Sequence, residues 1–335
     1  MSLPSTDPAR RLAPVIRLAP AKLNLTLSVT ERRTDGFHTL HSVFVPLALS
    51  DRLSLGPSAA ERDSLHVTGF DAGPLADNLV LRAIAAARAA VGSGWPGGPG
   101  PAPALAARLE KRIPVAAGLA GGSSDAAATL DGALEAWGAE LDAEARLATA
   151  ARLGSDVPFF LASGPALVEG RGEQVAPLHG LRGHPGVLLV TPAIAVSTPA
   201  VFEVFDGLGG RGNEATRMSS NHIAEELRSG LSAADLVARA GALTVSNDLL
   251  QAALILVPAL VPFRRGLTRL LGRPIGLSGS GPTLWALYPS EAEADAAADL
   301  VRVAVREGRL TAPGSAAPFV TATAMLTVAN EEKQP

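Results

Sequence analysis

The chain has 335 residues, and 47% of them are hydrophobic, enough to bury the core of one large domain or two smaller ones. Its 29 basic and 32 acidic residues give a net charge of −3 without a basic block, which argues against nucleic acid as a partner. Cysteine is absent, so disulfides, thiolate catalysis and cysteine-bound metals are excluded.

The first dozen residues contain no apolar segment typical of a signal peptide, and no apolar run approaches the roughly 20 residues that span a bilayer. The six histidines show none of the spacings typical of a zinc site. We therefore expect a cytoplasmic protein without a membrane partner or a metal site of its own, either a monomer or a weak homodimer. Disordered ends are expected up to residue 12 and from residue 329.

Between Val15 and Leu55, polar and apolar residues alternate in several runs, which predicts strands with a tight turn at residues 34–36. Lys22 and Asn24 share one face of such a strand, and the leucines beside them take the other face, which we expect to lie on the core. Alternation alone also fits a second interpretation, in which Lys22 and Asn24 lie on the solvent-exposed face of an edge strand.

Residues 63–70 predict a further strand, and the run from Asp77 to residue 91 predicts a helix begun by Asp77 or Asn78. Residues 92–103 are rich in glycine and proline and can form neither a helix nor a central strand. We expect a flexible surface loop there.

The stretch P-V-A-A-G-L-A-G-G-S-S-D-A-A-A-T-L, residues 114–130, is a glycine-rich turn that runs into an alanine-rich helix. We expect positive φ angles at Gly118, Gly121 and Gly122, and helix caps from Ser123 and Ser124. Backbone N–H groups in such a loop, together with the positive end of the helix dipole, bind an anion, most often a phosphate. The string lacks the Gly-Lys-Ser/Thr ending of a Walker A loop and the dinucleotide fingerprint. A plain turn before an ordinary helix is the alternative.

A second helix is expected from about Asp142 to Leu153, ending at Gly154. Asp156 then precedes a Val-Pro step and an apolar run, where a carboxylate serves either in catalysis or only as a helix N-cap.

Beyond this point the sequence predicts a domain boundary near residue 175 and, further on, a second glycine-rich loop that opens onto a strand, Gly276 to Leu287. The other elements expected in this half are a strand at 181–192, a mobile loop at 207–220, helical stretches to about 271, a closing helix at 291–307 and a last strand at 322–328.

Several blocks, in this order, resemble the GHMP kinase superfamily, and within it the diphosphocytidyl-methylerythritol kinase family. They are A-P-A-K-L-N-L-T-L (19–27) with R-R-T-D-G-F-H-T-L-H (32–41), N-L-V-L-R-A (78–83), the glycine-rich stretch at 114–127, G-S-D-V-P-F-F (154–160), V-S-T-P-A-V-F (196–202) and G-L-S-G-S-G-P (276–282). The chain departs from the family with Phe37 in place of tyrosine, Ala120 in place of glycine and Leu250 in place of the glutamate of N-D-L-E. We treat the N-D-L segment as structural.

The resemblance implies an α+β fold of two domains, residues 13–174 and 175–330, with the active site in the cleft between them. It implies ATP-dependent phosphorylation of the 2-hydroxyl of 4-diphosphocytidyl-2-C-methyl-D-erythritol, with Mg²⁺ assumed and no dedicated metal ligand readable. The small-molecule substrate and ATP would be the only partners. Lys22 and Asp156 would be the catalytic pair, with Asp156 either a base or an orienting group.

The resemblance also implies two sets of binding residues. The ATP-binding set is Asn78, Leu79, Pro114, Val115, Ala116, Ala117, Gly118, Leu119, Ala120, Gly121, Gly122, Ser123 and Ser124. The substrate-binding set is Asn24, Phe37, His38, Thr198, Phe202, Ser278, Gly279, Ser280 and Gly281.

Within the substrate-binding set, Phe37 and Phe202 would stack on the two faces of cytosine and His38 would bond its edge. On residue type alone, Phe37 and His38 also fit a locally packed turn, and Phe202 fits the core of a short helix.

Two other functions remain open at this stage. One is a GHMP kinase that acts on homoserine, mevalonate or a sugar, although these substrates offer no base for the two phenylalanines to stack on. The other is a catalytically inactive member that senses a ligand, against which the retention of both Lys22 and Asp156 argues.

Overall fold

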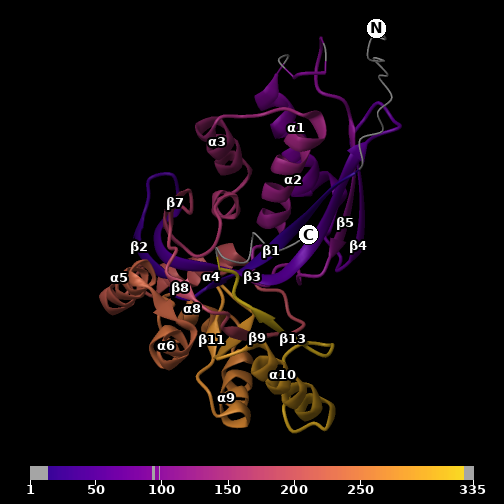
Figure 1. The fold of residues 1–335 in the computed structure, drawn as a ribbon. Coiled ribbons are helices and arrows are strands. Elements are labelled where there is room, and N and C mark those ends of the chain that lie inside the picture. The colour runs from indigo at the N-terminus through magenta and orange to yellow at the C-terminus, as the bar shows by residue number, and fades with distance from the viewer. Residues whose placement is uncertain (1–13, 93–94, 98, 328–335) are drawn as a thin grey trace.

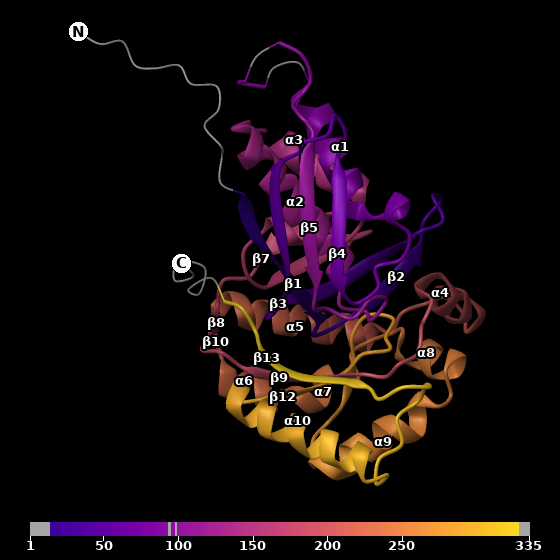
Figure 2. The ribbon, with the colours of Figure 1, turned by 90° about the vertical axis from the view of Figure 1, so that its right-hand side faces the viewer.

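The computed structural model describes residues 14–92, 95–97 and 99–327. The two expected disordered ends, at residues 1–12 and 329–335, and residues 93–94 and 98 of the expected loop lie outside the described residues. Within that part of the chain there are two stacked halves, and each half consists of a sheet with helices beside it (Figures 1 and 2). The α+β class is therefore confirmed.

A seven-stranded sheet forms the first half, built around one 20-residue strand, β3 (His38–Pro57). The turn at residues 34–36 is present, with Gly36 at φ 86°, and both strands that precede β3 pair with it antiparallel. The sheet order is β4-β5-β3-β6-β7, with β1 and β2 also on β3. The remaining strands are β1 (Val15–Asn24), β2 (Ser28–Arg32), β4 (Ser64–Gly69), β5 (Leu105–Lys111), β6 (Ala166–Gly170) and β7 (Gln174–Pro177).

Three helices cover one face of this sheet: α1 (Leu79–Val91), α2 (Gly121–Trp137) and α3 (Ala143–Leu153) (Figure 2). The starts of α1 and α3 follow the sequence, because Asn78 accepts from the backbone N–H of Val80 and Asp142 from that of Ala145. Two short 3₁₀ turns, at Leu75–Asp77 and Pro158–Leu161, complete the half. The core between sheet and helices consists of buried apolar side chains, among them Leu53, Leu55, Ile84, Leu109 and Leu130.

The second half has a four-stranded sheet with the order β11-β12-β9-β13. Its strands are β9 (Gly186–Thr191), β11 (Gly276–Leu277), β12 (Leu284–Tyr288) and β13 (Phe319–Ala324). Two short strands, β8 (Leu181–Arg182) and β10 (Leu231–Ser232), pair in parallel beside it. The helices are α4 (Thr198–Gly207), α5 (Glu214–Ser229), α6 (Ala233–Ala238), α7 (Ala240–Leu243), α8 (Leu250–Leu256), α9 (Leu260–Leu271) and α10 (Glu291–Arg306).

Two expectations for this half are wrong. The loop expected at residues 207–220 gives way to α5 at Glu214, because the side chain of Asn213 accepts from the backbone N–H of Ala215 and caps the helix. The last strand lies three residues earlier than expected, in antiparallel register with β9. In the described residues no single helix is long and apolar enough to cross a membrane. The pair α8 and α9 reaches that length and composition only when joined, and the two helices are bent by 119° relative to one another.

The two halves share a hydrophobic core. Side chains alternate along β9, so that Val187 and Leu189 pack against leucines and valines of the first half while Leu188 and Val190 pack toward α10. The chain also crosses back at its end, where the backbone N–H of Leu326 donates to the carbonyl of Pro46 at 2.9 Å. Near the expected boundary at residue 175, β7 still pairs with β6 in the first sheet.

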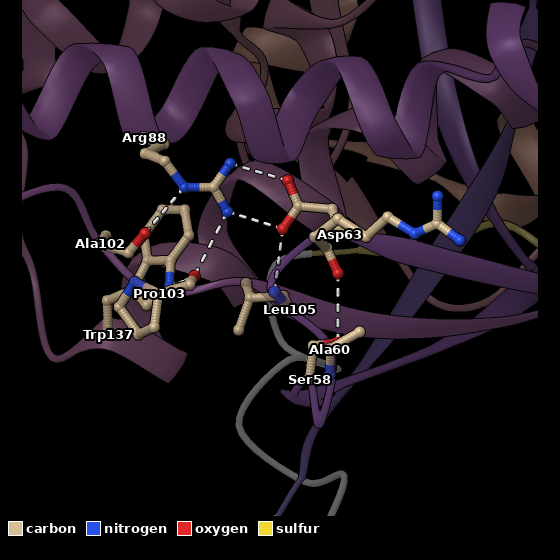
Figure 3. A network of polar contacts seen from close by, with 9 residues as sticks. Ser58, Ala60, Asp63, Arg88, Ala102, Pro103, Leu105 and Trp137 are labelled. Carbon is tan, nitrogen blue, oxygen red and sulfur yellow. Dashed lines mark hydrogen bonds and ion pairs between the residues drawn. The ribbon is translucent and has the colours of Figure 1, made fainter.

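The end of the glycine- and proline-rich segment is fixed by a polar network around Arg88 (Figure 3). The guanidinium of Arg88 forms two bonds of 2.6 and 2.7 Å with the carboxylate of Asp63 and donates to the carbonyl of Ala102 at 2.9 Å. The indole N–H of Trp137 donates to the carbonyl of Pro103, and Asp63 accepts from the backbone N–H of Leu105. These bonds give the segment a defined return into β5.

Candidate functional site

A cleft of about 620 Å³ lies where the two halves meet. Its walls come from β1, from residues 114–123, from the segment around Asp156, and from residues 196–202 and 279–280 of the second half. Most of the residues singled out from the sequence line this cleft: Lys22, Asn24, Asn78, Leu79, Pro114, Val115, Ala116, Ala117, Gly118, Ala120, Gly121, Gly122, Ser123, Asp156, Thr198, Phe202, Gly279 and Ser280.

The glycine-rich loop differs in detail from the expectation. Helix α2 begins at Gly121, so Ser123 and Ser124 lie in its first turn and do not cap it. Of the three glycines expected at positive φ, only Gly118 has it, at 75°, while Ala120 takes the left-handed conformation at φ 53°. The alanine that replaces a glycine therefore makes the turn itself, and the orphan N–H groups of the first helical turn follow at the cleft wall.

A second glycine-rich loop, residues 278–281, packs on the first. The hydroxyl of Ser278 donates to the carbonyl of Gly118 at 2.9 Å, and a Cβ on Gly118 would lie 2.3 Å from the carbonyl oxygen of Ser278. The side-chain amide of Asn247 donates to the carbonyls of Leu277 and Gly279, which supports our structural interpretation of the N-D-L segment. Close approach of the two loops thus requires glycine at 118.

Lys22 and Asp156 face one another across the cleft, with 3.6 Å between Nζ and Oδ2. The side chain of Lys22 is 5% exposed, so the interpretation of an exposed edge-strand face is wrong. Burial lowers the pKa of Lys22 from its ordinary value, and the charge of Asp156 opposes that shift. The short helix after Asp156 has Val157 at its N-cap, without a side-chain hydrogen bond. Asp156 therefore does not cap this helix, and the interpretation of Asp156 as a helix N-cap is wrong.

A buried charge cluster lies beneath the glycine-rich loop of residues 114–120, the expected phosphate loop. The sequence did not predict this cluster. Lys111 bonds both Asp51 and, at 2.7 Å, Asp125 of α2, and all three side chains are at most 5% exposed. Asp51 also accepts from the backbone N–H groups of Arg112 and Ile113, immediately before the loop. The cluster therefore holds both ends of the loop. Lys111 is one of only three lysines in the chain, and this rarity was the one feature of the sequence that could have drawn attention to the cluster.

Burial is the main cause of a raised pKa at Asp125, to about 7, and the neighbouring charge of Lys111 opposes it.

The opposite end of the cleft is aromatic. Phe202 on α4 lines the cleft, and its ring stacks on that of His38 with 4.7 Å between centroids. Nε2 of His38 lies 2.7 Å from Oδ1 of Asp206. Phe37 is half-exposed, outside the cleft lining, and the guanidinium carbon of Arg171 lies 5.2 Å from its ring centroid. We expected Phe37 and Phe202 to face one another across a base. In this structure the ring of His38, and not that of Phe37, lies against Phe202.

Five expected binding residues besides Phe37 lie outside the cleft lining. Leu119, Ser278 and Gly281 are buried supports of the two loops, His38 lies behind Phe202, and Ser124 is buried on the other side of α2. Thr198 and Ser280 line the cleft together, with 2.8 Å between their hydroxyl oxygens.

Comparison with known proteins identifies the family of the chain. Residues 78–164 match the family model of the GHMP kinases N terminal domain. The 4-diphosphocytidyl-2-C-methyl-D-erythritol kinase of Rhodococcus jostii (strain RHA1) is 40% identical over 289 residues, 85% of this chain and 86% of the relative. That of Streptomyces coelicolor is 38% identical over 310 residues, 89% and 96% of the two chains.

Among solved structures, a 4-(cytidine 5'-diphospho)-2C-methyl-D-erythritol kinase is 32% identical with a TM-score of 0.64, over 93% of this chain and 99% of that one. The homoserine kinase of Cytophaga hutchinsonii is 16% identical with a TM-score of 0.65, over 98% of each chain, and shares the fold alone. With relatives this similar along nearly their whole length, the chain belongs to the 4-diphosphocytidyl-2-C-methyl-D-erythritol kinase family of the GHMP kinases.

Proposed function

We propose that the chain transfers a phosphoryl group from ATP to the 2-hydroxyl of 4-diphosphocytidyl-2-C-methyl-D-erythritol, giving the 2-phosphate and ADP. This is a step of the methylerythritol phosphate route to isoprenoid precursors, and the family of the chain supports it. The observation that carries the proposal is the pair Lys22 and Asp156, which meet in the same cleft as the phosphate loop.

Phosphoryl transfer needs in-line positioning, neutralisation of charge on the phosphoryl oxygens and a group that orients the attacking hydroxyl. The first turn of α2 presents backbone N–H groups and the positive end of a helix dipole to the cleft, which suits the phosphates of ATP. Asp156 accepts the hydroxyl proton or orients the hydroxyl, and the Lys22 ammonium attracts the transferred group.

Mg²⁺ fits the donors of the cleft. Mg²⁺ in kinases is usually held by one or two carboxylates, substrate phosphates and water. The cleft supplies the partly exposed carboxylate of Asp156 and the hydroxyl of Ser123, while no group of three or more acidic or histidine side chains that could hold a metal occurs in the described residues. When bound, the ion would be held by these two side chains together with the phosphates, and it would offset negative charge on the transferred group.

The aromatic end of the cleft is proposed to bind the cytosine. Phe202 supplies a stacking face beside the cleft, with His38 against it, and Phe37 comes from the turn before β3. We also propose that the chain is cytoplasmic and acts as a monomer or weak homodimer.

A coupled ADP-release assay tests this function, with the cytidyl substrate, mevalonate and homoserine compared at equal concentration. We expect turnover with the cytidyl substrate only. Preferred turnover of mevalonate or homoserine would assign the chain to another kinase reaction, and no turnover of any of them would favour the inactive, ligand-sensing alternative.

A further inference from the structure

The side chain of Asn24 lines the cleft, yet its amide is already engaged at both ends. Oδ1 lies 2.6 Å from Nζ of Lys22, and Nδ2 lies 3.1 Å from Oγ of Ser42 on β3. Ser42 is fully buried, and its hydroxyl bonds the backbone carbonyl of Thr26. Three side chains thus form a chain of bonds from a main-chain carbonyl to the ammonium of Lys22.

The polarity of this chain has one solution. Ser42 has a single hydroxyl proton, and a carbonyl can only accept, so that proton goes to Thr26. Toward Asn24 the hydroxyl of Ser42 can then only accept, which requires the NH₂ end of the amide to face it. The amide oxygen is left for Lys22, whose ammonium has donors and no acceptor.

The reverse orientation of the amide would place its NH₂ group against the ammonium, two sets of donors without an acceptor. Removal of the Ser42 hydroxyl takes away the group that excludes this orientation. Besides its bond with Asn24, Nζ lies 3.6 Å from the carboxylate of Asp156 and 4.3 Å from the ring centroid of Phe44.

We propose that Ser42 is a positioning residue for phosphoryl transfer: it fixes the amide of Asn24, and through it holds the Lys22 ammonium at the reacting end of the cleft. The proposal rests on the proposed kinase function. It also gives Asn24 a role in positioning Lys22, beyond the substrate contact expected from the sequence.

The first test compares Ser42→Ala with Ser42→Thr and Ser42→Cys. We expect Ser42→Ala to lower turnover about tenfold, the equivalent of one hydrogen bond to a charged group, with little change in the KM for ATP. Ser42→Cys keeps the volume but offers a weak acceptor, so it should also lower turnover, while Ser42→Thr keeps the hydroxyl and most of the activity.

The second test is a double-mutant cycle. Asn24→Leu removes the link between Ser42 and Lys22, so Ser42→Ala should change turnover less than about twofold in that background. Effects that multiply would show that Ser42 acts independently of Asn24 and would overturn the proposal, as would normal turnover of Ser42→Ala and Ser42→Cys. The matched control is Ser50→Ala on the same strand. The Ser50 hydroxyl donates to the carbonyl of Ala48 and lies outside the cleft lining, so its loss should leave turnover unchanged.

Failure of the proposed function would be visible separately. The wild-type chain is assayed first, and the Ser42 ratios are then measured with whichever acceptor it phosphorylates. A readout without turnover is the hydrogen exchange of the Asn24 side-chain amide by NMR, which should be slow in the wild type and in Ser42→Thr and faster in Ser42→Ala. Equal exchange in all three would overturn the proposal.

Discussion

At the scale of single residues, the proposed catalytic pair is a carboxylate and an ammonium of unequal burial. Asp156 is 28% exposed in its side chain and Lys22 is 5% exposed, so the carboxylate is the more accessible of the two groups. In the proposed reaction, neutralising this carboxylate would remove the acceptor of the hydroxyl proton without altering the glycine-rich loop.

Asp156→Asn should therefore lower turnover by about 10²-fold or more, the usual worth of a positioned acid–base group, with ATP affinity nearly intact. Lys22→Met, which keeps the stem and removes the charge, should lower turnover more than substrate affinity. Steady-state kinetics and ATP titration measure both. Near-normal turnover of Asp156→Asn would show that another group takes the proton.

The buried carboxyl of Asp125 predicts a dependence of stability on pH. Its pKa is raised from 3.8 to about 7 in the folded chain, so folding favours the protonated form. The stabilisation is complete below about pH 4 and is lost as pH rises toward 7. Asp125→Asn removes this titration, so the wild type should lose stability relative to the variant between these values. Urea unfolding of both at pH 4, 5.5 and 7 is the measurement; a constant difference would mean that Lys111 keeps Asp125 ionised throughout.

Ala120 holds a left-handed conformation, which costs a residue with a Cβ about 1–2 kcal/mol. Ala120→Gly removes that cost and adds about 0.4–1 kcal/mol of entropy to the unfolded chain, so the free energy of unfolding should rise by up to about 1 kcal/mol. Ala126→Gly, in the helix that follows, is the control and should destabilise by at least about 1 kcal/mol, because Ala126 is also fully buried. Denaturation midpoints compare them; loss of stability in Ala120→Gly would mean that the strain is absent.

At the scale of elements, the turn before β3 and helix α4 are proposed to bind the cytosine from two sides. Phe202→Ala or Phe37→Ala should weaken substrate binding by about 1–3 kcal/mol, the worth of one base–aromatic stack, while ATP affinity hardly moves. His38→Ala should relax discrimination between cytidyl and uridyl substrates, because a hydrogen-bonding edge rejects the wrong partner more strongly than stacking. Phe37→Tyr should be nearly neutral.

Michaelis constants for cytidyl and uridyl substrates measure these effects. If both alanine variants bind the cytidyl substrate like the wild type, the base is held elsewhere. If only Phe202→Ala weakens binding, Phe37 does not contact the cytosine and keeps its contact with Arg171.

Elements with local signals were predictable from the sequence. Alternation located β1 to β3, and the caps Asn78 and Asp142 placed α1 and α3 correctly to within a residue. The first part of α5, up to Ser220, was missed because its buried face includes Thr216 and Ser220, which blur the apolar period of a helix.

The cleft was predictable only in part, for a similar reason. The phosphate-loop candidate is contiguous in sequence, so its glycine-rich turn into a helix could be recognised. The cluster of Asp51, Lys111 and Asp125 joins residues 14 and 60 positions apart, and such pairs leave no periodic signal. The start of α2 was misplaced because a left-handed alanine breaks the rule that reserves that conformation for glycine.

At the scale of the whole molecule, the shared core predicts that the two halves unfold together. Trp137 packs in the first half, on α2, and Trp285 lies in the second-half sheet within the core cluster that both halves build. In variants that lack Trp95 and keep only one of these two tryptophans, fluorescence should report the same denaturation midpoint, in agreement with circular dichroism. Two separated midpoints would show that the halves are independent.

The same shared core has a consequence during synthesis. The first half leaves the ribosome with Leu23, Val45 and Leu47 complete in their strands but without the β9 side chains that cover them. The strand β13, which closes the second sheet, is made only at residues 319–324, close to the end of the chain. Nascent chains that stop before this strand expose a hydrophobic surface. We therefore expect them to bind chaperones and to aggregate.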